Sequence, residues 1–382
     1  MEFYADIAAV QLSKTGEELC GDKVEITRTN TTTTVVISDG LGSGVKANIL
    51  ATLTTKIASS LLTRGIPLEE VVTTIAQTLP ICRERKIAYS TLHIITMSSN
   101  GETTIAEFDS PPTFLIRSGK VIPFPTKERM VANKNFRIGT LTLQENDMLI
   151  AVSDGVIHAG IGGLLKLGWN WQGIQEYLVA EIDNYQNAKD VAQSILACCN
   201  GYYLGAPGDD STTVSIKLRR PRHLSLLTGP PGDKTLDEMI VKNFLHHSGM
   251  KVIAGGTTAK IVSRIIHKPL LVDLCYYDED VPPTARLDGI NLVTEGVLTL
   301  FTTIRRLTDT RRLMDRSFLD GATRLARILN ECDYIHIFAG KAINTAHQNP
   351  LFPAQLNVKK QILEELKEKL EGAGKRVFIE WY

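Results

Sequence analysis

Hydrophobic and polar positions along the first 220 residues predict many strands and two groups of helices. Short runs of β-branched and apolar residues are typical of strands. Apolar residues with helical spacing separate these runs at 45–63, 67–86 and about 172–200. Long strand runs with clustered helices favour a layered sheet sandwich over a βαβ array. The predicted strands are 1–12, 21–27, 31–38, 90–97, 103–109, 113–119, 136–143, 147–154 and 209–218.

The first two predicted helices have clear sequence signals. Apolar residues recur every four positions from Val45 to Leu61, which predicts one apolar helical face. Gly65 ends that helix, and Pro67 opens the next one. Acidic residues near the start of the second helix and basic residues near its end suit the helix dipole. We therefore expect a pair of adjacent helices here.

The rhythm of the sequence changes after RRPRH at 219–223. Short apolar strands then alternate with helical stretches, which predicts an α/β domain with a mostly parallel sheet. The whole chain is thus an α+β protein of two domains, 1–219 and 222–382, as its 382 residues suggest. The strands predicted for the second domain are 224–227, 251–255, 269–274, 290–296, 334–340 and 376–381, followed or preceded by helices that include a charged amphipathic one at 355–372.

Composition narrows the class of protein. The chain is 43% hydrophobic and 22% charged, which is ordinary for a soluble globular protein. Lys+Arg and Asp+Glu both number 42, and no basic run occurs, so we expect no nucleic-acid partner. No apolar stretch approaches the roughly 18 residues that span a membrane, and the N-terminus lacks a signal pattern. The six cysteines form no CxxC pair, which predicts reduced thiols in a cytoplasm.

Acidic residues stand beside glycines or other acids at the ends of the predicted strands of the first domain. Hard divalent cations prefer carboxylate, carbonyl and water ligands, and converging aspartates repel one another unless a cation neutralises them. Each aspartate taken alone is well explained as a helix cap or a turn residue. The set as a whole favours a metal site, formed by Asp22, Asp39, Asp154, Asp209 and Asp210.

Four short motifs that contain these aspartates together resemble the motifs of a known family. The series GD, SDGLGSGVKAN, VSDGV and GDDSTTVSI is similar to the metal-dependent protein phosphatases (PPM, phosphatase 2C class). It more closely resembles the bacterial branch typified by the stage II sporulation protein E (SpoIIE), which includes stress-response phosphatases. The stretch FDSPPTFLIRSGKV also looks like that branch. The resemblance covers residues 1–219 and implies a β-sandwich flanked by helices, with two Mn²⁺ or Mg²⁺ ions at one edge.

The resemblance also implies a role for each acidic residue. Asp39 would bridge both ions, and the Gly40 carbonyl and Asp22 would serve the first ion, partly through water. Asp154 and Asp209 would hold the second ion. Two such cations lower the pKa of a bridging water and clamp the phosphate oxygens, so that a hydroxide attacks phosphorus in line. The catalytic set is therefore the four aspartates, with no nucleophilic side chain.

Other positions depart from the family pattern or leave alternatives open. Asp210 follows Asp209 in the motif, so it would lie behind the ligands or help a third, weaker ion. Many eukaryotic members carry an N-terminal arginine that grips phosphate; Lys14 and Lys23 lie in different contexts, and the sporulation-type branch also lacks it. His158 is either an acid toward the leaving oxygen or a polar residue near a helix start.

The predicted function is that of a cytoplasmic bacterial protein serine/threonine phosphatase in sporulation or stress-response signalling. Its implied substrate is a phosphoprotein, such as an anti-sigma-factor antagonist. The helices at 45–63 and 67–86 correspond to a pair treated in this branch as a switch of metal-site assembly. Two alternatives stay open: a catalytically silent phosphatase-fold scaffold or sensor, and a C-terminal domain that is itself an enzyme. A homodimer is also left open.

The C-terminal domain contains loops of a kind that binds small molecules. LSLLTGPPGDKT lacks the GxxxxGK[ST] spacing of a phosphate-binding Walker A loop. Two further loops follow predicted strands, and in a parallel sheet the carboxyl ends of strands are the usual place for ligands. The alternative is that their glycines and threonines only shape tight turns. If the loops bind an effector, the candidate residues are Gly255, Gly256, Thr257, Thr258, Thr294, Glu295 and Gly296.

Overall fold

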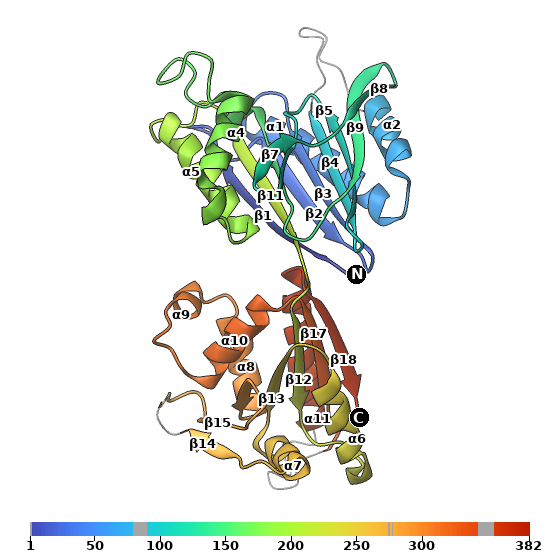
Figure 1. Ribbon diagram of the computed structural model, residues 1–382, viewed down its shortest axis with the longest axis vertical. Coiled ribbons are helices and arrows are strands. Elements are labelled where there is room, and N and C mark those ends of the chain that lie inside the picture. Colours follow the sequence, from blue (N-terminus) through green and yellow to red (C-terminus); the bar gives the residue numbers. More distant parts are fainter. Residues whose placement is uncertain (1, 79–89, 274–275, 277, 343–354) are drawn as a thin grey trace. The chain divides into compact units, whose positions relative to one another are not determined.

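The chain forms two compact units, Met1–Arg220 and Pro221–Tyr382, which we call the N-terminal and C-terminal units (Figure 1). The structure is a computed structural model. It describes residues 2–78, 90–273, 276, 278–342 and 355–382, without the side chains of 355–357. Residues 79–86 of the second predicted helix and residue 274 of a predicted strand lie outside the described residues. No helix in the described ranges has both the length and the apolar character needed to cross a membrane.

Two antiparallel sheets form the centre of the N-terminal unit. In spatial order, the first sheet contains β1 (Tyr4–Leu12), β11 (Ser211–Arg219), β10 (Met148–Val152), β6 (Phe114–Arg117) and β7 (Lys120–Pro123). In the same way, the second contains β2 (Asp22–Arg28), β3 (Thr32–Asp39), β4 (Leu92–Ser98), β5 (Glu102–Phe108), β9 (Lys134–Thr142) and β8 (Lys127–Val131).

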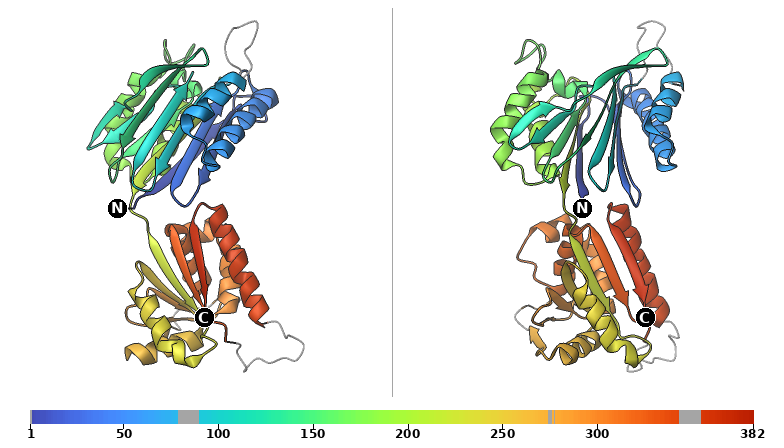
Figure 2. Two further views of the ribbon diagram at one scale, coloured as in Figure 1. Left: turned by 90° about the vertical axis from the view of Figure 1, so that its right-hand side faces the viewer. Right: turned by 45° about the vertical axis from the view of Figure 1, so that its right-hand side comes forward.

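The sheets pack face to face and carry helices on their outer faces (Figure 2). Val35 and Ile95 of the second sheet meet Leu149 and Val214 of the first in one buried core. Further cores join the second sheet to α1 (Gly44–Thr63) and α2 (Leu68–Thr78), and the first to α3 (Asp154–Ile157), α4 (Asn170–Glu181) and α5 (Ala188–Tyr202). The predicted β-sandwich with helical layers is confirmed.

One predicted helix needs correction, and two short strands were not predicted. The stretch predicted as one helix at about 172–200 is two helices, because Asn187 and Asp190 form a capping box that starts α5 afresh. A 3₁₀ turn, η1 (Ile182–Asn184), follows α4. The short strands β7 and β8 were not predicted, since each has too few buried positions to show an alternating pattern.

The apolar face predicted for α1 is real but points to solvent. Val45, Ile49, Leu53 and Ile57 are between 43% and 55% exposed. The buried face of α1 instead consists of small residues, namely Gly44, Ala47, Ala51, Thr54, Thr55, Ala58 and Ser59. The helix therefore lies close to β2 and β3 through a smooth surface of short side chains.

A seven-stranded sheet forms the centre of the C-terminal unit, and it is mostly parallel, as predicted. One strand, β15, runs antiparallel to its neighbours β14 and β16, and it was not predicted. In spatial order the strands are β14 (Leu271–Asp273), β15 (Thr284–Arg286), β16 (Leu292–Thr294), β13 (Met250–Ala254), β12 (His223–Thr228), β17 (Tyr334–Ala339) and β18 (Arg376–Trp381).

Helices cover both faces of this sheet. One face packs against α6 (Asp237–His246) and α7 (Gly256–Ile266), and a 3₁₀ turn, η2 (Lys234–Leu236), precedes α6. The other face packs against α8 (Val297–Arg306), α10 (Gly321–Glu331) and α11 (Gln355–Gly372), while α9 (Thr310–Met314) lies against α10. The predicted helix at 355–372 is confirmed.

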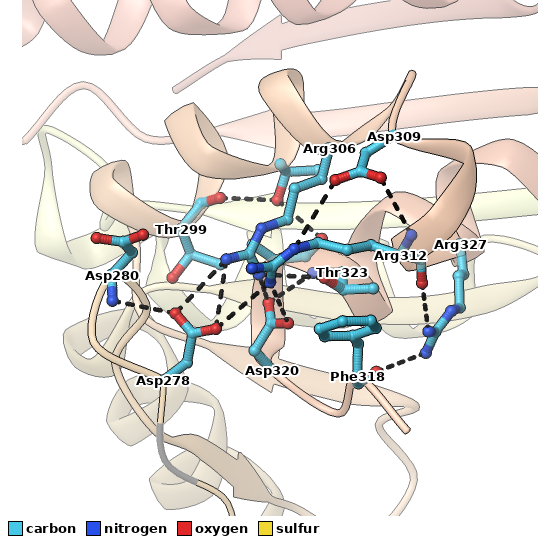
Figure 3. A network of polar contacts seen from close by, with 12 residues as sticks. Asp278, Asp280, Thr299, Arg306, Asp309, Arg312, Phe318, Asp320, Thr323 and Arg327 are labelled. Carbon is cyan, nitrogen blue, oxygen red and sulfur yellow. Dashed lines mark hydrogen bonds and ion pairs between the residues drawn. The ribbon is translucent and has the colours of Figure 1, made fainter. Parts of the chain in front are cut away.

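A buried ionic network joins α8 to α10 (Figure 3). The Arg306 guanidinium donates to the carboxylate of Asp320 and, at 3.1 Å, to the Thr323 hydroxyl. Asp320 also accepts the Thr323 amide at 2.8 Å, which caps the start of α10. Asp278 lies 3.4 Å from the same guanidinium. Both Arg306 and Asp320 are buried, so each depends on the other for neutralisation.

We predict that Arg306→Ala destabilises the C-terminal unit by about 3–5 kcal/mol, because it leaves the buried Asp320 carboxylate with only the Thr323 amide and the Arg312 guanidinium, 3.8 Å away. Hydrogen exchange of peptides from α8 and α10 measures this loss. Arg305→Ala is the matched control, since Arg305 is the exposed neighbour on the same helix. Equal exchange in the two variants would contradict the role given to the network.

Candidate metal centre

Asp22 and Asp39 face each other at the end of the β2–β3 pair. They are direct cross-strand partners, Asp22 as the first residue of β2 and Asp39 as the last of β3. The Asp39 amide donates to the Thr91 hydroxyl at 2.9 Å, and the Thr91 amide donates to the Asp39 carbonyl at 2.9 Å. Like charges at directly opposed positions repel each other, so other interactions must offset the repulsion between Asp22 and Asp39.

The other predicted aspartates lie where β10 ends and β11 begins. The Ser153 amide donates to the Thr212 carbonyl at 2.9 Å, and the Thr212 amide donates to the Ser153 hydroxyl at 2.8 Å. This pair of bonds fixes Asp154 near Asp209 and Asp210. Asp154 is the first residue of the short helix α3 and does not end the strand as predicted, because β10 stops at Val152.

The glycine of each SDG motif is required for space. A Cβ on Gly40 would overlap the carbonyl oxygen of Ala47 in α1. A Cβ on Gly155 would overlap the carbonyl oxygen of Asp210. Neither glycine has a positive φ, so close backbone approach, not turn geometry, explains both. The two motifs thus bring α1 close to β3, and α3 close to the start of β11.

Polar contacts join the two sheets at this edge. The Gln11 side-chain amide donates to the Asp22 carbonyl at 3.2 Å and to the Thr212 hydroxyl at 3.0 Å. The Lys14 amide donates to the Asp210 carboxylate at 2.9 Å. A Cβ on Gly21 would lie only 2.8 Å from the other oxygen of that carboxylate. Asp210 is therefore held beside Asp22, although 188 residues separate the two in sequence.

The Asp22 carboxylate is buried and accepts no hydrogen bond of normal geometry. It is 1% exposed, and neither carboxylate oxygen has a partner of normal hydrogen-bond geometry. Burial, together with the charges of Asp154 and Asp210 and opposed by the nearby hydroxyls of Thr212 and Ser153, raises the pKa of Asp22 to about 6. One oxygen of Asp210 is also buried and unpartnered. Such orphaned carboxylate oxygens require an explanation, and a divalent cation is one that fits.

Asp39 shows the strongest effect of the cluster. Burial raises its pKa to about 9, together with the charges of Asp22, Asp154 and Asp209. The pKa of Asp209 is also raised, by burial and by the charge of Asp154. All the predicted aspartates of the N-terminal unit therefore lie within electrostatic reach of one another.

The carboxylate and carbonyl oxygens of this cluster are the type of ligand that divalent cations prefer. The side chains do not, however, converge on one point. Within the described ranges, no three carboxylates, imidazoles or thiols converge as tightly as metal ligands do. Burial is the main cause of the raised pKa of Asp39, and the charges of Asp22, Asp154 and Asp209 raise it too, so these carboxylates are neighbours. Carboxylates that repel one another relax apart when nothing neutralises them, so their spacing is compatible with a cation site. The residues that would hold ions are Asp22, Asp39, Asp154, Asp209 and Asp210, with the Gly40 carbonyl beside them.

Sequence reasoning missed the residues that position the cluster. Thr91 and Gln11 act through hydrogen bonds to segments far away in the chain, and no local motif marks them. The Tyr203 hydroxyl donates to the Gly155 carbonyl at 2.7 Å, so that carbonyl already has a partner. His158 is the exposed residue that ends α3.

The candidate loops of the C-terminal unit also come together. The Gly255 amide donates to the Thr294 carbonyl at 2.9 Å, so the ends of β13 and β16 are joined. A Cβ on Gly296 would lie 3.6 Å from the Gly255 Cα. Thr258 is buried in the first turn of α7, while Gly256, Thr257 and Glu295 are exposed.

The sandwich, its helical layers and the aspartate motifs define the N-terminal unit as a PP2C-type phosphatase domain. Residues 29–219, half of the chain, match the family described as Stage II sporulation protein E (SpoIIE). The chain belongs to this family of metal-dependent serine/threonine phosphatases.

The chain is also similar to several solved structures. The phosphatase domain of SpoIIE from Bacillus subtilis is 18% identical, covers 57% of this chain and 94% of that chain, and gives a TM-score of 0.45. The same domain with a fragment of its regulatory domain is 19% identical, covers 57% and 63%, and gives 0.49. The RsbU and RsbW domains of a Mycobacterium tuberculosis protein are 14% identical, cover 63% and 68%, and give 0.48. Comparison with curated proteins yields no match.

Proposed function

We propose that the N-terminal unit hydrolyses phosphoserine or phosphothreonine on a bacterial regulatory protein, with the help of two divalent cations. The observation that carries this proposal is the gathering of Asp22, Asp39, Asp154 and Asp209 at one edge of the sandwich, where burial and mutual repulsion raise the pKa of Asp39 to about 9. A carboxyl group in such a place requires either a proton or a cation. Family membership favours the cation.

In this proposal each residue keeps the role implied by its motif. Asp39, at the end of β3, would bridge two ions, and its electrostatic interaction with carboxylates from both sheets supports this role. Asp22 and the Gly40 carbonyl would serve one ion, and Asp154 and Asp209 the other. Asp210 would support them, since the Lys14 amide already occupies one of its oxygens. When bound, Mn²⁺ or Mg²⁺ neutralises phosphate charge and lowers the pKa of a water molecule.

The proposed substrate is a phosphorylated regulatory protein, for which an anti-sigma-factor antagonist is the specific candidate. The sequence resemblance supports this choice, because the matching branch acts on such proteins. The alternative of a catalytically silent scaffold has less support, because all the aspartates of the motifs are present and lie together. We place the protein in the bacterial cytoplasm because its cysteines form no CxxC pair in the sequence.

We predict Mn²⁺-dependent hydrolysis of p-nitrophenyl phosphate by the full chain. Asp39→Ala and Asp154→Ala each lower this activity by a factor on the order of 100 or more, since each removes charge that holds the cations. Glu102→Gln, which removes an exposed carboxylate of β5, is the control and keeps wild-type activity. A wild-type chain without metal-dependent activity would instead support the scaffold alternative.

We further propose that α1 acts as a switch on the metal centre. Its buried face consists of small side chains, so it can shift against β2 and β3 with little loss of apolar contact. Because the Gly40 backbone lies directly against the Ala47 carbonyl, a movement of α1 would displace Gly40 and then Asp39. The proposal links the position of α1 to cation affinity.

Gly40→Ala tests this link, since its methyl group would push α1 away from β3. We expect the Mn²⁺ concentration for half-maximal activity to rise by about tenfold or more, which corresponds to roughly 1.4 kcal/mol of binding free energy. Gly201→Ala is the control, because a Cβ there has open space around it. Unchanged Mn²⁺ affinity in Gly40→Ala, with the fold intact, would refute the switch.

For the C-terminal unit we propose a regulatory, ligand-binding role. Its support is the convergence of the loops after β13 and β16 at the carboxyl edge of a mostly parallel sheet. A small molecule bound there would change the activity of the phosphatase unit through the chain that joins them.

A further inference from the structure

The last strand of the C-terminal unit has an open side. β18 lies at one end of the seven-stranded sheet and pairs along its whole length with β17 (Figure 1). No other strand of the described residues pairs with its second side. At the opposite end of the sheet, β14 has three residues, whereas β18 has six and contains neither glycine nor proline. An open edge of this length is a template for pairing with a strand of another chain.

The backbone of β18 shows which residues can form such a pair. The Arg376 amide donates to the Asp333 carbonyl at 2.8 Å, on the side of β17. Neighbouring residues of a strand direct their N–H and C=O groups to opposite sides. Val377 and Ile379 therefore direct these groups toward the open edge. In an antiparallel pair with another strand, these two residues would occupy the hydrogen-bonded positions.

One face of β18 carries opposite charges on either side of an exposed aromatic ring. Arg376, Phe378 and Glu380 share this face, because side chains alternate along a strand. Phe378 is 60% exposed, so the centre of the face is open to solvent. The Arg376 guanidinium lies 4.9 Å from the centroid of the Tyr334 ring, and the Glu380 carboxylate lies 3.1 Å from His336 Nε2. The Glu380 side chain is nevertheless half exposed, and Arg376 is partly exposed, so a further chain can reach both charges.

These charges make β18 complementary to itself. If two copies pair antiparallel about a twofold axis at Phe378, Arg376 of each copy lies opposite Glu380 of the other. Val377 then lies opposite Ile379, so the backbone groups that face the edge meet in the same register as the charges. A shift by two residues separates both charge pairs. A shift by four places Arg376 or Glu380 opposite the same residue of the second copy, which is unfavourable.

We propose that two copies of this chain associate through β18 in this antiparallel register, so that one continuous sheet crosses both C-terminal units. The interface is isologous, since the same strand serves both copies. Its specificity comes from two pairs of opposite charge and from the backbone hydrogen bonds between them. The inference does not depend on the phosphatase proposal, because it concerns association and not hydrolysis.

The test is sedimentation velocity of the full chain at concentrations from about 1 to 100 µM, the range in which a small interface dissociates. We expect a reversible equilibrium between monomer and dimer. A wild-type chain that stays monomeric throughout this range overturns the inference and leaves the edge to a strand of a different protein.

Charge reversal tests the register. Arg376→Glu places a carboxylate opposite Glu380 of the second copy, and Glu380→Arg places a guanidinium group opposite Arg376. Each variant should raise the dissociation constant of the dimer by about tenfold or more, because both attractive pairs become repulsive. Lys260→Glu, at an exposed position of α7, is the control for the change in net charge and should dimerise as the wild type does.

An equal mixture of the Arg376→Glu and Glu380→Arg chains should dimerise again, since every acid then lies opposite a guanidinium group. A structural defect in either variant does not produce this rescue. Single variants that dimerise like the wild type, or a mixture that stays monomeric, overturn the inference.

Phe378→Lys provides a second test if a charge-reversal variant fails to fold. The position is exposed, so the monomer should tolerate the change, whereas two ammonium groups would meet on the twofold axis of the dimer. We expect the dissociation constant to rise by about tenfold or more. Wild-type dimerisation of this variant overturns the inference.

Discussion

Repulsion among buried carboxylates is the constraint on which the N-terminal unit depends. Asp22 and Asp39 are opposed across β2 and β3, and Asp154, Asp209 and Asp210 reach them from the other sheet. The fold holds them together through backbone hydrogen bonds and two glycine contacts that admit no side chain. Without a cation, the cluster lowers its repulsion by retaining protons, which is the meaning of the raised pKa of Asp39.

The same backbone contacts tie the cluster to the outer helices. The Ala47 carbonyl of α1 lies against Gly40, and the start of α3 lies against the Asp210 backbone. The buried face of α1 consists of small side chains, which is the feature that supports the proposed coupling between α1 and Asp39. In the C-terminal unit, the glycine loops after β12 and β17 meet beside Lys359 of α11, a buried cation that donates to the Gly340 carbonyl.

The sequence predicted the sandwich and the mostly parallel second sheet, because strand runs are local signals, and its acidic motifs marked the five aspartates that we propose as the metal site. It did not reveal that the apolar stripe from Val45 to Ile57 faces solvent, since periodicity shows that a face exists and not where it points. Thr91, Gln11 and Lys359 also escaped prediction, because each acts through a contact between segments far apart in the chain. Strand β15, three residues long, was too short to show a pattern.

Proton release on metal binding tests the central claim most directly. With the pKa of Asp39 at about 9, this group is protonated at neutral pH in the cation-free protein, and a bound cation must displace the proton. Titration of the full chain with Mn²⁺ at pH 7.5, in buffers of different ionisation enthalpy, measures that release. The account predicts that Mn²⁺ binding releases about one proton per chain from the wild-type protein. It predicts that this release is absent in the Asp39→Asn variant. Mn²⁺ binding without proton release, or release unchanged in Asp39→Asn, would contradict it.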